Sequence, residues 1–243
     1  MPEEYGKTRH ELLDELRGGQ NPPLVWLYCS DSRVDYDLFD ANPGDIFSIE
    51  NAGNVFGLGD ESKSSLAYAL SHFAVDGRLS ILVMGHTHCG AVTAACGHFK
   101  ERGPLPHPSI SSLLRHIYPS VELALSRKGG DLVYDAISEN VLAQMRAIRD
   151  FALEVDGIKA PNVSVYGAIY DISSVDDIRP EAWSLEVVKD GRKNFKSEIV
   201  RHDVEARNGR RRLDDFADRI MKIGRLVRGK LPSSHGRKNR ETV

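Results

Sequence analysis

The sequence predicts an α/β protein with a mostly parallel central β-sheet flanked by helices. Several apolar runs have the length of buried strands, and segments with helical periodicity lie between them. The connections between successive strands are long, as the crossovers of a parallel sheet must be. With 243 residues, of which 41% are hydrophobic, the chain is long enough to bury one substantial core.

The first element is expected to be a short amphipathic helix within residues 3–18, stopped by Gly18-Gly19. Its apolar positions are Leu12, Leu13 and Leu16. So short a helix does not fold alone, and we expect it to pack elsewhere, for instance on another subunit. Residues 1–20 are therefore assigned to an N-terminal helical arm.

Two strands are predicted next. The apolar run at 24–28 indicates a buried strand that Cys29 ends, and residues 46–50 form a second strand after the turn at 42–45. The loop at 51–54, with the sequence Asn-Ala-Gly-Asn, is rich in residues that tolerate unusual backbone angles.

A helix is expected over about 60–76, because its apolar residues fall on one stripe. A third strand is predicted at 79–84, and it runs into Gly85-His86. Another helix is expected from Cys89 onward.

The following part of the chain contains two more helices and two more strands. Residues 109–126 are predicted to be helical with a break near Pro119, and 131–151 shows the clearest helical pattern. A fourth strand is predicted at 162–170, and alternating residues at 183–188 indicate an antiparallel edge strand.

A basic segment follows this α/β domain, which we assign to residues 21–200. From residue 189 to the end, 17 Lys and Arg stand against 8 Asp and Glu, whereas the rest of the chain has 15 against 27. Residues 201–243 are assigned to a basic C-terminal helical extension whose end is expected to be disordered. Such a segment suits an anionic partner, an acidic face of the same body, or the body of a neighbouring subunit.

Candidate metal ligands stand at the ends of two predicted strands. Cys29 closes the first strand and His86 closes the third, and ligands of open α/β sheets gather outside the carboxyl ends of the strands. Cys89 lies at the start of a helix, whose N-terminal dipole favours a thiolate. Two thiolates and one imidazole form a Cys2His set, which binds Zn2+ and leaves a fourth position for water. The pKa of that water falls to roughly 7, so zinc-bound hydroxide is available near neutrality.

Asp31 and Arg33 follow Cys29 at alternate positions, so all three side chains can point the same way in an extended segment. Asp31 would either accept a hydrogen bond from zinc-bound water or bind zinc itself and close the site. Arg33 would lower the pKa of Asp31 and fix its orientation through paired hydrogen bonds.

These motifs resemble those of the β-class carbonic anhydrase family, over about residues 24–188. The matching segments are Cys-Ser-Asp-Ser-Arg-Val at 29–34, Pro-Gly-Asp at 43–45, Asn-Ala-Gly-Asn at 51–54, Ser-Leu-x-Tyr-Ala at 65–69 and Gly-His-Thr-x-Cys-Gly at 85–90, with weaker echoes at 139–144 and 167–171.

The resemblance implies reversible hydration of carbon dioxide to bicarbonate and a proton. It assigns Zn2+ to Cys29, His86 and Cys89, and the orientation of the zinc-bound water to Asp31 and Arg33. It also implies a homodimer or a dimer of dimers, with clefts at subunit interfaces and the N-terminal helix reaching over the partner.

Five further residues are candidates for the substrate pocket. Asn42 stands before Pro-Gly, where one subclass of the family carries a Gln near the substrate. Gly90 directly follows Cys89. Phe47, Val55 and Tyr68 suit an apolar pocket for a small neutral gas, although the same side chains also suit the core.

Two alternative functions fit the same motifs. The zinc site also resembles that of hydrolases of carbon disulfide or carbonyl sulfide. A zinc-stabilised binding protein would instead use the basic C-terminal segment on an anionic partner. The Asp31–Arg33 pair argues against this last function, because structural zinc does not need it.

The composition also limits which partners and which cellular compartment are expected. No aromatic residues interleave with the Arg210-Arg211-Arg212 run, so nucleic-acid binding is not expected. The longest apolar run has strand length, which predicts no membrane span. The N-terminus has no basic flank and no apolar stretch, so no signal peptide is expected, and three cysteines suit a reducing cytoplasm.

Overall fold

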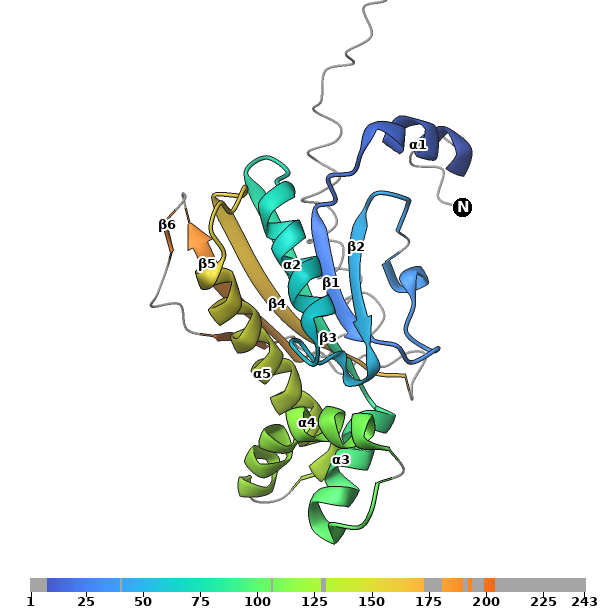
Figure 1. Cartoon of the computed structure of the whole chain (residues 1–243), viewed down its shortest axis with the longest axis vertical. Helices are drawn as coiled ribbons and strands as arrows, with labels where there is room; N and C mark the ends of the chain where they lie inside the picture. The colour runs from blue at the N-terminus through green and yellow to red at the C-terminus, as the bar shows by residue number, and fades with distance from the viewer. Residues whose placement is uncertain are drawn as a thin grey trace, which may run out of the picture.

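A central β-sheet runs through the computed structural model (Figure 1), which describes residues 8–39, 41–105, 107–127, 130–172, 181–189, 192–193 and 199–203. Its strands are β1 (Leu24–Cys29), β2 (Ile46–Asn51), β3 (Arg78–His86), β4 (Asn162–Tyr170), β5 (Glu181–Lys189), β6 (Arg192–Lys193) and β7 (Val200–Asp203). The strand order is β2-β1-β3-β4-β5-β6, and β7 also pairs with β5. Strands β2, β1, β3 and β4 are parallel, whereas β5 runs antiparallel to β4. The predicted α/β class with a mostly parallel sheet is confirmed.

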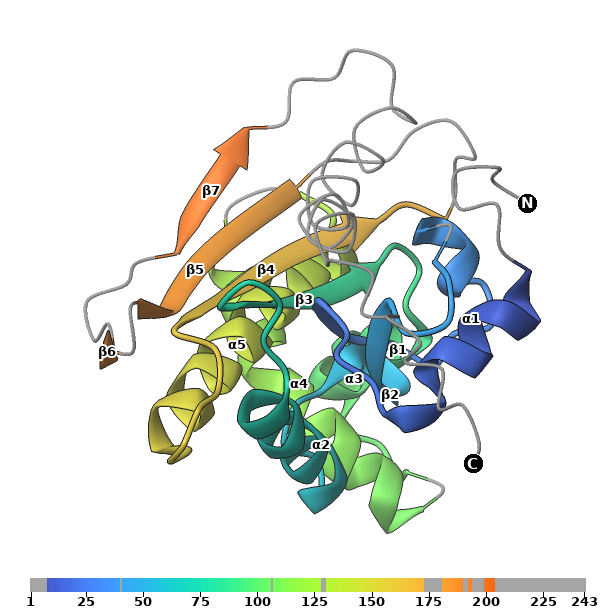
Figure 2. The same cartoon turned by 90° about the horizontal axis from the view of Figure 1, so that it is seen from above.

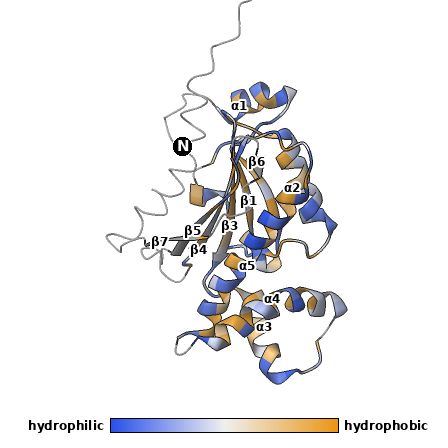
Figure 3. Ribbon diagram, turned by 90° about the vertical axis from the view of Figure 1, so that its left-hand side faces the viewer, coloured by the Kyte–Doolittle hydropathy of each residue, from blue (hydrophilic) through white to orange (hydrophobic). Residues whose placement is uncertain are grey.

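Helices α2 (Asp60–His72) and α5 (Leu132–Glu154) cover one face of this sheet. The other described helices are α1 (Arg9–Glu15), α3 (Gly90–Glu101) and α4 (Pro108–Ser126), with short 3-10 helices at Leu16–Gly18, Tyr36–Phe39 and Ala52–Asn54. Figure 2 shows α2 and α5 on the same side of the strands, and Figure 1 shows α3 and α4 beyond their ends. Hydrophobic and hydrophilic residues are mixed along these helices, as amphipathic helices require (Figure 3).

Both faces of β1 are buried, which explains its uninterrupted apolar sequence. Alternate residues, among them Val25 and Leu27, belong to the large core under the helices. Trp26 and Tyr28 face the other side, where they stack with ring centroids 3.8 Å apart and Phe39 packs edge-on against Trp26. β1 is thus held on both sides, which fixes the position of its last residue.

Helix α5 approaches the sheet closely at two glycines. A Cβ atom on Gly85 would lie 2.8 Å from Val141 Cγ2, and one on Gly167 would lie 2.8 Å from Val141 Cγ1. A side chain at either glycine would force the helix away. α5 therefore lies directly against the carboxyl end of β3, one residue before His86.

Three sequence predictions are wrong in detail. Helix α2 ends at His72 and not near residue 76, because Asp76 and Gly77 have positive φ in a turn that two backbone hydrogen bonds close between Val75 and Arg78. Strand β5 is not at the edge, since β6 and β7 pair with it on the side away from β4.

The third difference is in α4, which passes through Pro119 without the predicted break. Proline removes one helical hydrogen bond, but the residues around it are anchored. Ile117, Ser120 and Val121 are buried, and α4 packs on both α3 and α5. Tertiary packing outweighs the local preference here.

The two ends of the chain are described only in part. α1 begins after a capping box formed by Thr8 and Glu11, and none of its residues is buried. Residues 1–7 of the predicted arm, and the predicted basic extension from residue 204 onward, lie outside the described residues. Among the described helices, none has the length and apolar character needed to cross a membrane.

Candidate metal centre

Three candidate ligands converge at the carboxyl end of the sheet. Cys29 is the last residue of β1, His86 is the last residue of β3, and Cys89 is the N-cap of α3. β1 and β3 are adjacent and parallel, so their carboxyl ends meet at one edge. The ligand atoms lie within 4.8 Å of one another, and the two Sγ atoms are 4.0 Å apart. No other group of this kind occurs in the described part of the chain.

The imidazole of His86 brings an unprotonated nitrogen to this cluster. Its Nδ1 lies 2.9 Å from the carbonyl oxygen of Thr87, and because a carbonyl only accepts, Nδ1 carries the proton. Nε2 is then a bare acceptor, and it is buried without a hydrogen-bond partner. A buried lone pair beside two thiols fits a metal ion that takes nitrogen and sulfur ligands.

The two thiols are strongly coupled. A hydrogen bond from the Cys89 thiol lowers the pKa of Cys29, and the backbone N–H of Gly53 acts in the same direction, against burial. The pKa of Cys89 is raised, because its thiol donates to the Cys29 sulfur and is itself buried. Loss of both protons would place two negative charges side by side in a buried site, which requires a cation.

Asp31 and Arg33 form a bidentate ion pair beside the cluster. Nε of Arg33 donates to Oδ1 of Asp31 and Nη2 donates to Oδ2, each at 2.7 Å. The backbone N–H of Arg33 also donates to Oδ1. These bonds hold the pKa of the Asp31 carboxyl well below its usual range. Oδ2 of Asp31 lies 3.8 Å from Nε2 of His86, so the carboxylate reaches the edge of the cluster.

The loop after β2 lies against Cys29. The N–H of Gly53 donates to the Cys29 sulfur at 3.2 Å. Gly53 has a φ of +74°, and a Cβ atom there would lie 3.1 Å from the Cβ of Ala91, so glycine suits the position on both counts. The side chain of Asn51 closes the loop with two hydrogen bonds to the backbone of Val55.

A buried pair behind His86 is absent from the sequence predictions. Thr87 Oγ1 donates to Asp171 Oδ1 at 2.7 Å and accepts from the N–H of Ile172 at 3.0 Å. The N–H of Thr87 also donates to the carbonyl of Tyr170. The residue after His86 is thereby tied to the end of β4. The Gly-x-x-Tyr-Asp echo at 167–171 was the one sequence signal that pointed to Asp171.

The predicted pocket residues fall into two groups. Gly90 follows Cys89 directly, and a Cβ atom there would meet open space. Val55 is buried in the loop that contacts Cys29. These two therefore lie at or next to the cluster.

The other three predicted pocket residues do not join the cluster of their own chain. Asn42 precedes β2 at the end opposite Asn51, which pairs with Cys29. Phe47 pairs with Val25, about 13 Å along the strand from the cluster. Tyr68 lies on α2, stacks on His72 and is 46% exposed.

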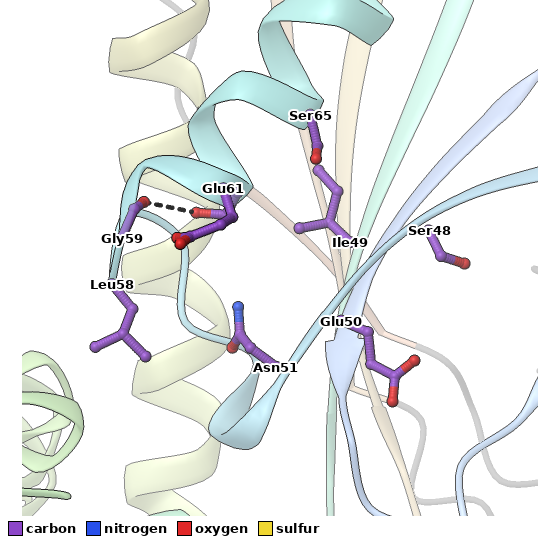
Figure 4. Close-up of a pocket in the computed structure, with 9 residues that line it drawn as sticks. Ser48, Ile49, Glu50, Asn51, Leu58, Gly59, Glu61 and Ser65 are labelled. Atoms are coloured by element: carbon purple, nitrogen blue, oxygen red, sulfur yellow. Dashed lines mark hydrogen bonds between the residues drawn. The ribbon is translucent and has the colours of Figure 1, made fainter. Parts of the chain in front are cut away.

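A separate pocket of about 500 Å³ lies between β2 and the start of α2 (Figure 4). Ser48, Glu50 and Glu61 are among the residues that line it, and none of the three candidate ligands is. Its two carboxylates make it unfavourable for an anion such as bicarbonate. Glu50 already accepts a hydrogen bond from the Tyr28 hydroxyl at 2.9 Å.

The fold and the cluster together define an α/β protein in which sulfur and nitrogen atoms able to ligate a metal lie at the carboxyl edge of an open sheet. The family profile described as carbonic anhydrase matches residues 24–176. The chain therefore belongs to the carbonic anhydrase family, and its structural relatives place it in the β class. The family predicted from the sequence motifs is confirmed.

Individual carbonic anhydrases are similar in sequence to this chain. The carbonic anhydrase of Synechocystis sp. is 30% identical over 181 residues, which are 70% of this chain and 64% of that protein. The carbonic anhydrase of Pseudomonas aeruginosa is 30% identical over 177 residues, 69% of this chain and 77% of that protein. The chain thus spans less than two thirds of the Synechocystis protein.

Solved structures share the fold. The β-carbonic anhydrase CcaA is 28% identical with a TM-score of 0.56, over 79% of this chain and 88% of that chain. A tetrameric β-carbonic anhydrase from Sordaria macrospora is 25% identical with a TM-score of 0.52, over 68% of this chain and 83% of that chain.

Proposed function

We propose that this protein is a zinc-dependent carbonic anhydrase that interconverts carbon dioxide and bicarbonate. The observation that supports this most directly is the bare Nε2 of His86 beside the sulfur atoms of Cys29 and Cys89. Zn2+ takes such a Cys2His set with a fourth position open. Cys29, His86 and Cys89 would hold the ion, which when bound supplies a Lewis acid that lowers the pKa of a coordinated water to roughly 7.

Asp31 has an orienting role in this proposal. Arg33 keeps its carboxylate ionised, and a carboxylate of such low pKa is a poor general base but a strong hydrogen-bond acceptor. Oδ2 faces the cluster, where it would accept a hydrogen bond from a reacting water and so direct the oxygen lone pair of that water toward carbon dioxide. Arg33 contacts both carboxylate oxygens and holds that direction.

We further propose a homodimer, or a dimer of dimers, as the working assembly. The outer edge of β2 is unpaired within the described residues, and α1 buries none of its residues. Phe47 lies about 13 Å along its strand from its own cluster, and the ring of Tyr68 stacks near it, with ring centroids 6.1 Å apart. Both would therefore line the cleft of a second copy, and we place Asn42 in the same shared region. The arm at 1–20, the body at 21–200 and the extension at 201–243 remain the proposed division. Free thiol ligands suit a reducing cytoplasm.

Stopped-flow hydration of carbon dioxide, from about pH 6.5 to about pH 9, tests the activity on protein of known zinc content. We expect turnover that requires zinc and that is lost in Cys29→Ser. Sulfide release from carbonyl sulfide or carbon disulfide without hydration would instead favour the hydrolase. A zinc-loaded protein that turns over none of these substrates would favour the binding protein.

A further inference from the structure

We propose that Asn140 and Gln144, on α5, are positioning residues that fix the hydrogen bond from Gly53 to the Cys29 sulfur. This inference rests on the proposed function, because it concerns a ligand of the same metal site. Neither residue belongs to the cluster, and both act through the loop after β2.

Gly53 is held on both sides. Its N–H donates to Cys29 Sγ at 3.2 Å, and its carbonyl oxygen accepts from Nδ2 of Asn140 at 2.9 Å. Because Gly53 has a positive φ, its two peptide groups take directions that other residues adopt only with strain. The contact from Asn140 therefore helps to fix the direction in which the Gly53 N–H points.

Gln144 fixes Asn140 in turn. It lies one helical turn further along α5, where its Nε2 donates to Oδ1 of Asn140 at 3.0 Å. Its Oε1 accepts from the N–H of Phe56 at 2.9 Å. Gln144 thus sets the orientation of the Asn140 amide and anchors the far end of the same loop.

The side-chain amides of Asn140 and Gln144 are almost fully buried, so their hydrogen bonds contribute to the stability of this arrangement. Asn140 is 1% exposed and Gln144 is 4% exposed. Amides at such depth are strongly unfavourable unless their hydrogen bonds are satisfied, and the hydrogen bonds described above join them to each other and to the loop.

Helix α5 also contacts the strand that carries His86. Val141, next to Asn140, packs into the space left by Gly85 and Gly167. Figure 1 shows α5 running alongside β3 and β4. One helix therefore sets the position of the loop on Cys29 relative to the end of β3.

A hydrogen bond to a thiolate orients it and reduces the charge that it donates to a metal. Loss of the Asn140 amide would free the Gly53 peptide and remove this control. We expect a loss of metal affinity of about 10- to 100-fold, the range typical for groups that support a ligand.

The test compares Asn140→Ala and Gln144→Met with Ile148→Ala, a packing control on the same helix, two turns beyond Asn140 and buried. Hydrogen exchange at the Gly53 amide is measured on metal-free protein. Cobalt(II) affinity and the sulfur-to-cobalt charge-transfer bands are measured on the same variants. We expect faster exchange, weaker cobalt binding and shifted bands in the two amide variants, and unchanged bands in Ile148→Ala.

Each other result overturns the inference. Unchanged exchange at Gly53 would mean that the amides do not hold the peptide. Faster exchange with unchanged cobalt binding and spectrum would mean that the loop is held for its own stability. Equal spectral shifts in Ile148→Ala would assign the effect to general loss of packing. A wild-type protein that binds no cobalt would overturn the proposed function as well, and this outcome is recognised before any variant is compared.

Discussion

Nε2 of His86 and Oδ2 of Asp31 face each other at 3.8 Å, and both are hydrogen-bond acceptors. The proton of the imidazole is on Nδ1, and the carboxyl group is ionised because Arg33 lowers its pKa. Two acceptors in this arrangement need a cation or a hydrogen-bond donor between them. The pair thus indicates where a metal ion and its water would be placed.

The cluster predicts which cysteines are needed for zinc. Cys29→Ser and Cys89→Ser remove a thiolate from the Cys2His set, and we expect both to lose zinc. Cys96 is the matched control, because it is also a buried free cysteine but lies outside the cluster. Elemental analysis of purified protein should show zinc retained in Cys96→Ala. Equal zinc loss in all three variants would contradict the assignment.

The bidentate pair predicts that lysine cannot replace Arg33. A lysine keeps the charge but donates to the carboxylate from a single point, so Asp31 loses its fixed direction. We expect Arg33→Lys to retain zinc and to lose about 10²-fold in kcat. Steady-state hydration kinetics on zinc-quantified protein measure this, and an unchanged kcat would show that orientation of Asp31 is unimportant.

The lowered pKa of Asp31 predicts a pH-dependent contribution to stability. The folded pKa lies below the ordinary value of 3.8, so the contribution is fully present above that value and is lost as pH falls through the folded pKa. The stability difference between the wild type and Arg33→Ala should be constant above about pH 5 and should shrink in more acidic solution. Urea unfolding at a series of pH values measures it. A difference that grows on acidification would reverse the sign and refute the prediction.

The pair behind His86 predicts the effect of Thr87→Val. Valine keeps the shape but removes the hydroxyl that joins Asp171 Oδ1 to the N–H of Ile172. We expect a loss of about 1–3 kcal/mol in the free energy of unfolding, because buried polar groups lose a partner. Thr87→Ser should recover most of it in denaturant titrations. Thr93→Val, at an exposed position of α3, is the control and should have little effect.

Alanine substitutions at two glycines should change the free energy of unfolding in opposite directions. Gly85→Ala places a Cβ atom 2.8 Å from Val141 and should lower the free energy of unfolding by about 1–3 kcal/mol. Gly97→Ala lies inside α3 with nothing within 4 Å, so it should raise stability by about 0.5–1 kcal/mol. Thermal and urea unfolding test both, and stabilisation by Gly85→Ala would disprove the close approach of α5.

Much of the fold follows from local patterns in the sequence. The apolar run before Cys29 predicts a strand buried on both faces, and the run before His86 predicts a second strand of the same kind. Parallel pairing then brings both residues to one edge of the sheet. The sequence predicts the pairing of Arg33 with Asp31, but the extended segment from which it was predicted is wrong. The N–H of Val34 donates to the carbonyl oxygen of Asp31, so residues 31–34 form a turn, and the two side chains meet within that turn.

Other features depend on contacts between distant segments, which a single sequence does not specify. The N–H of Gly53 reaches Cys29 through the pairing of β1 with β2, and Asp171 meets Thr87 through the pairing of β3 with β4. Asn140 and Gln144 were visible as an echo of the family motif, yet their contacts depend on the close packing of α5. Pro119 is tolerated for the same reason, since packing overrides a local signal.

The candidate ligands come from β1, β3 and the start of α3, so they meet only after these strands have paired. An ion that binds this arrangement and not the unfolded chain adds its binding energy to the folded state. Metal supply would then govern how long the protein survives in the cell, because chains made without the ion are more often open to proteases. Scarcity of the metal would reduce the abundance of this protein as well as its rate per molecule.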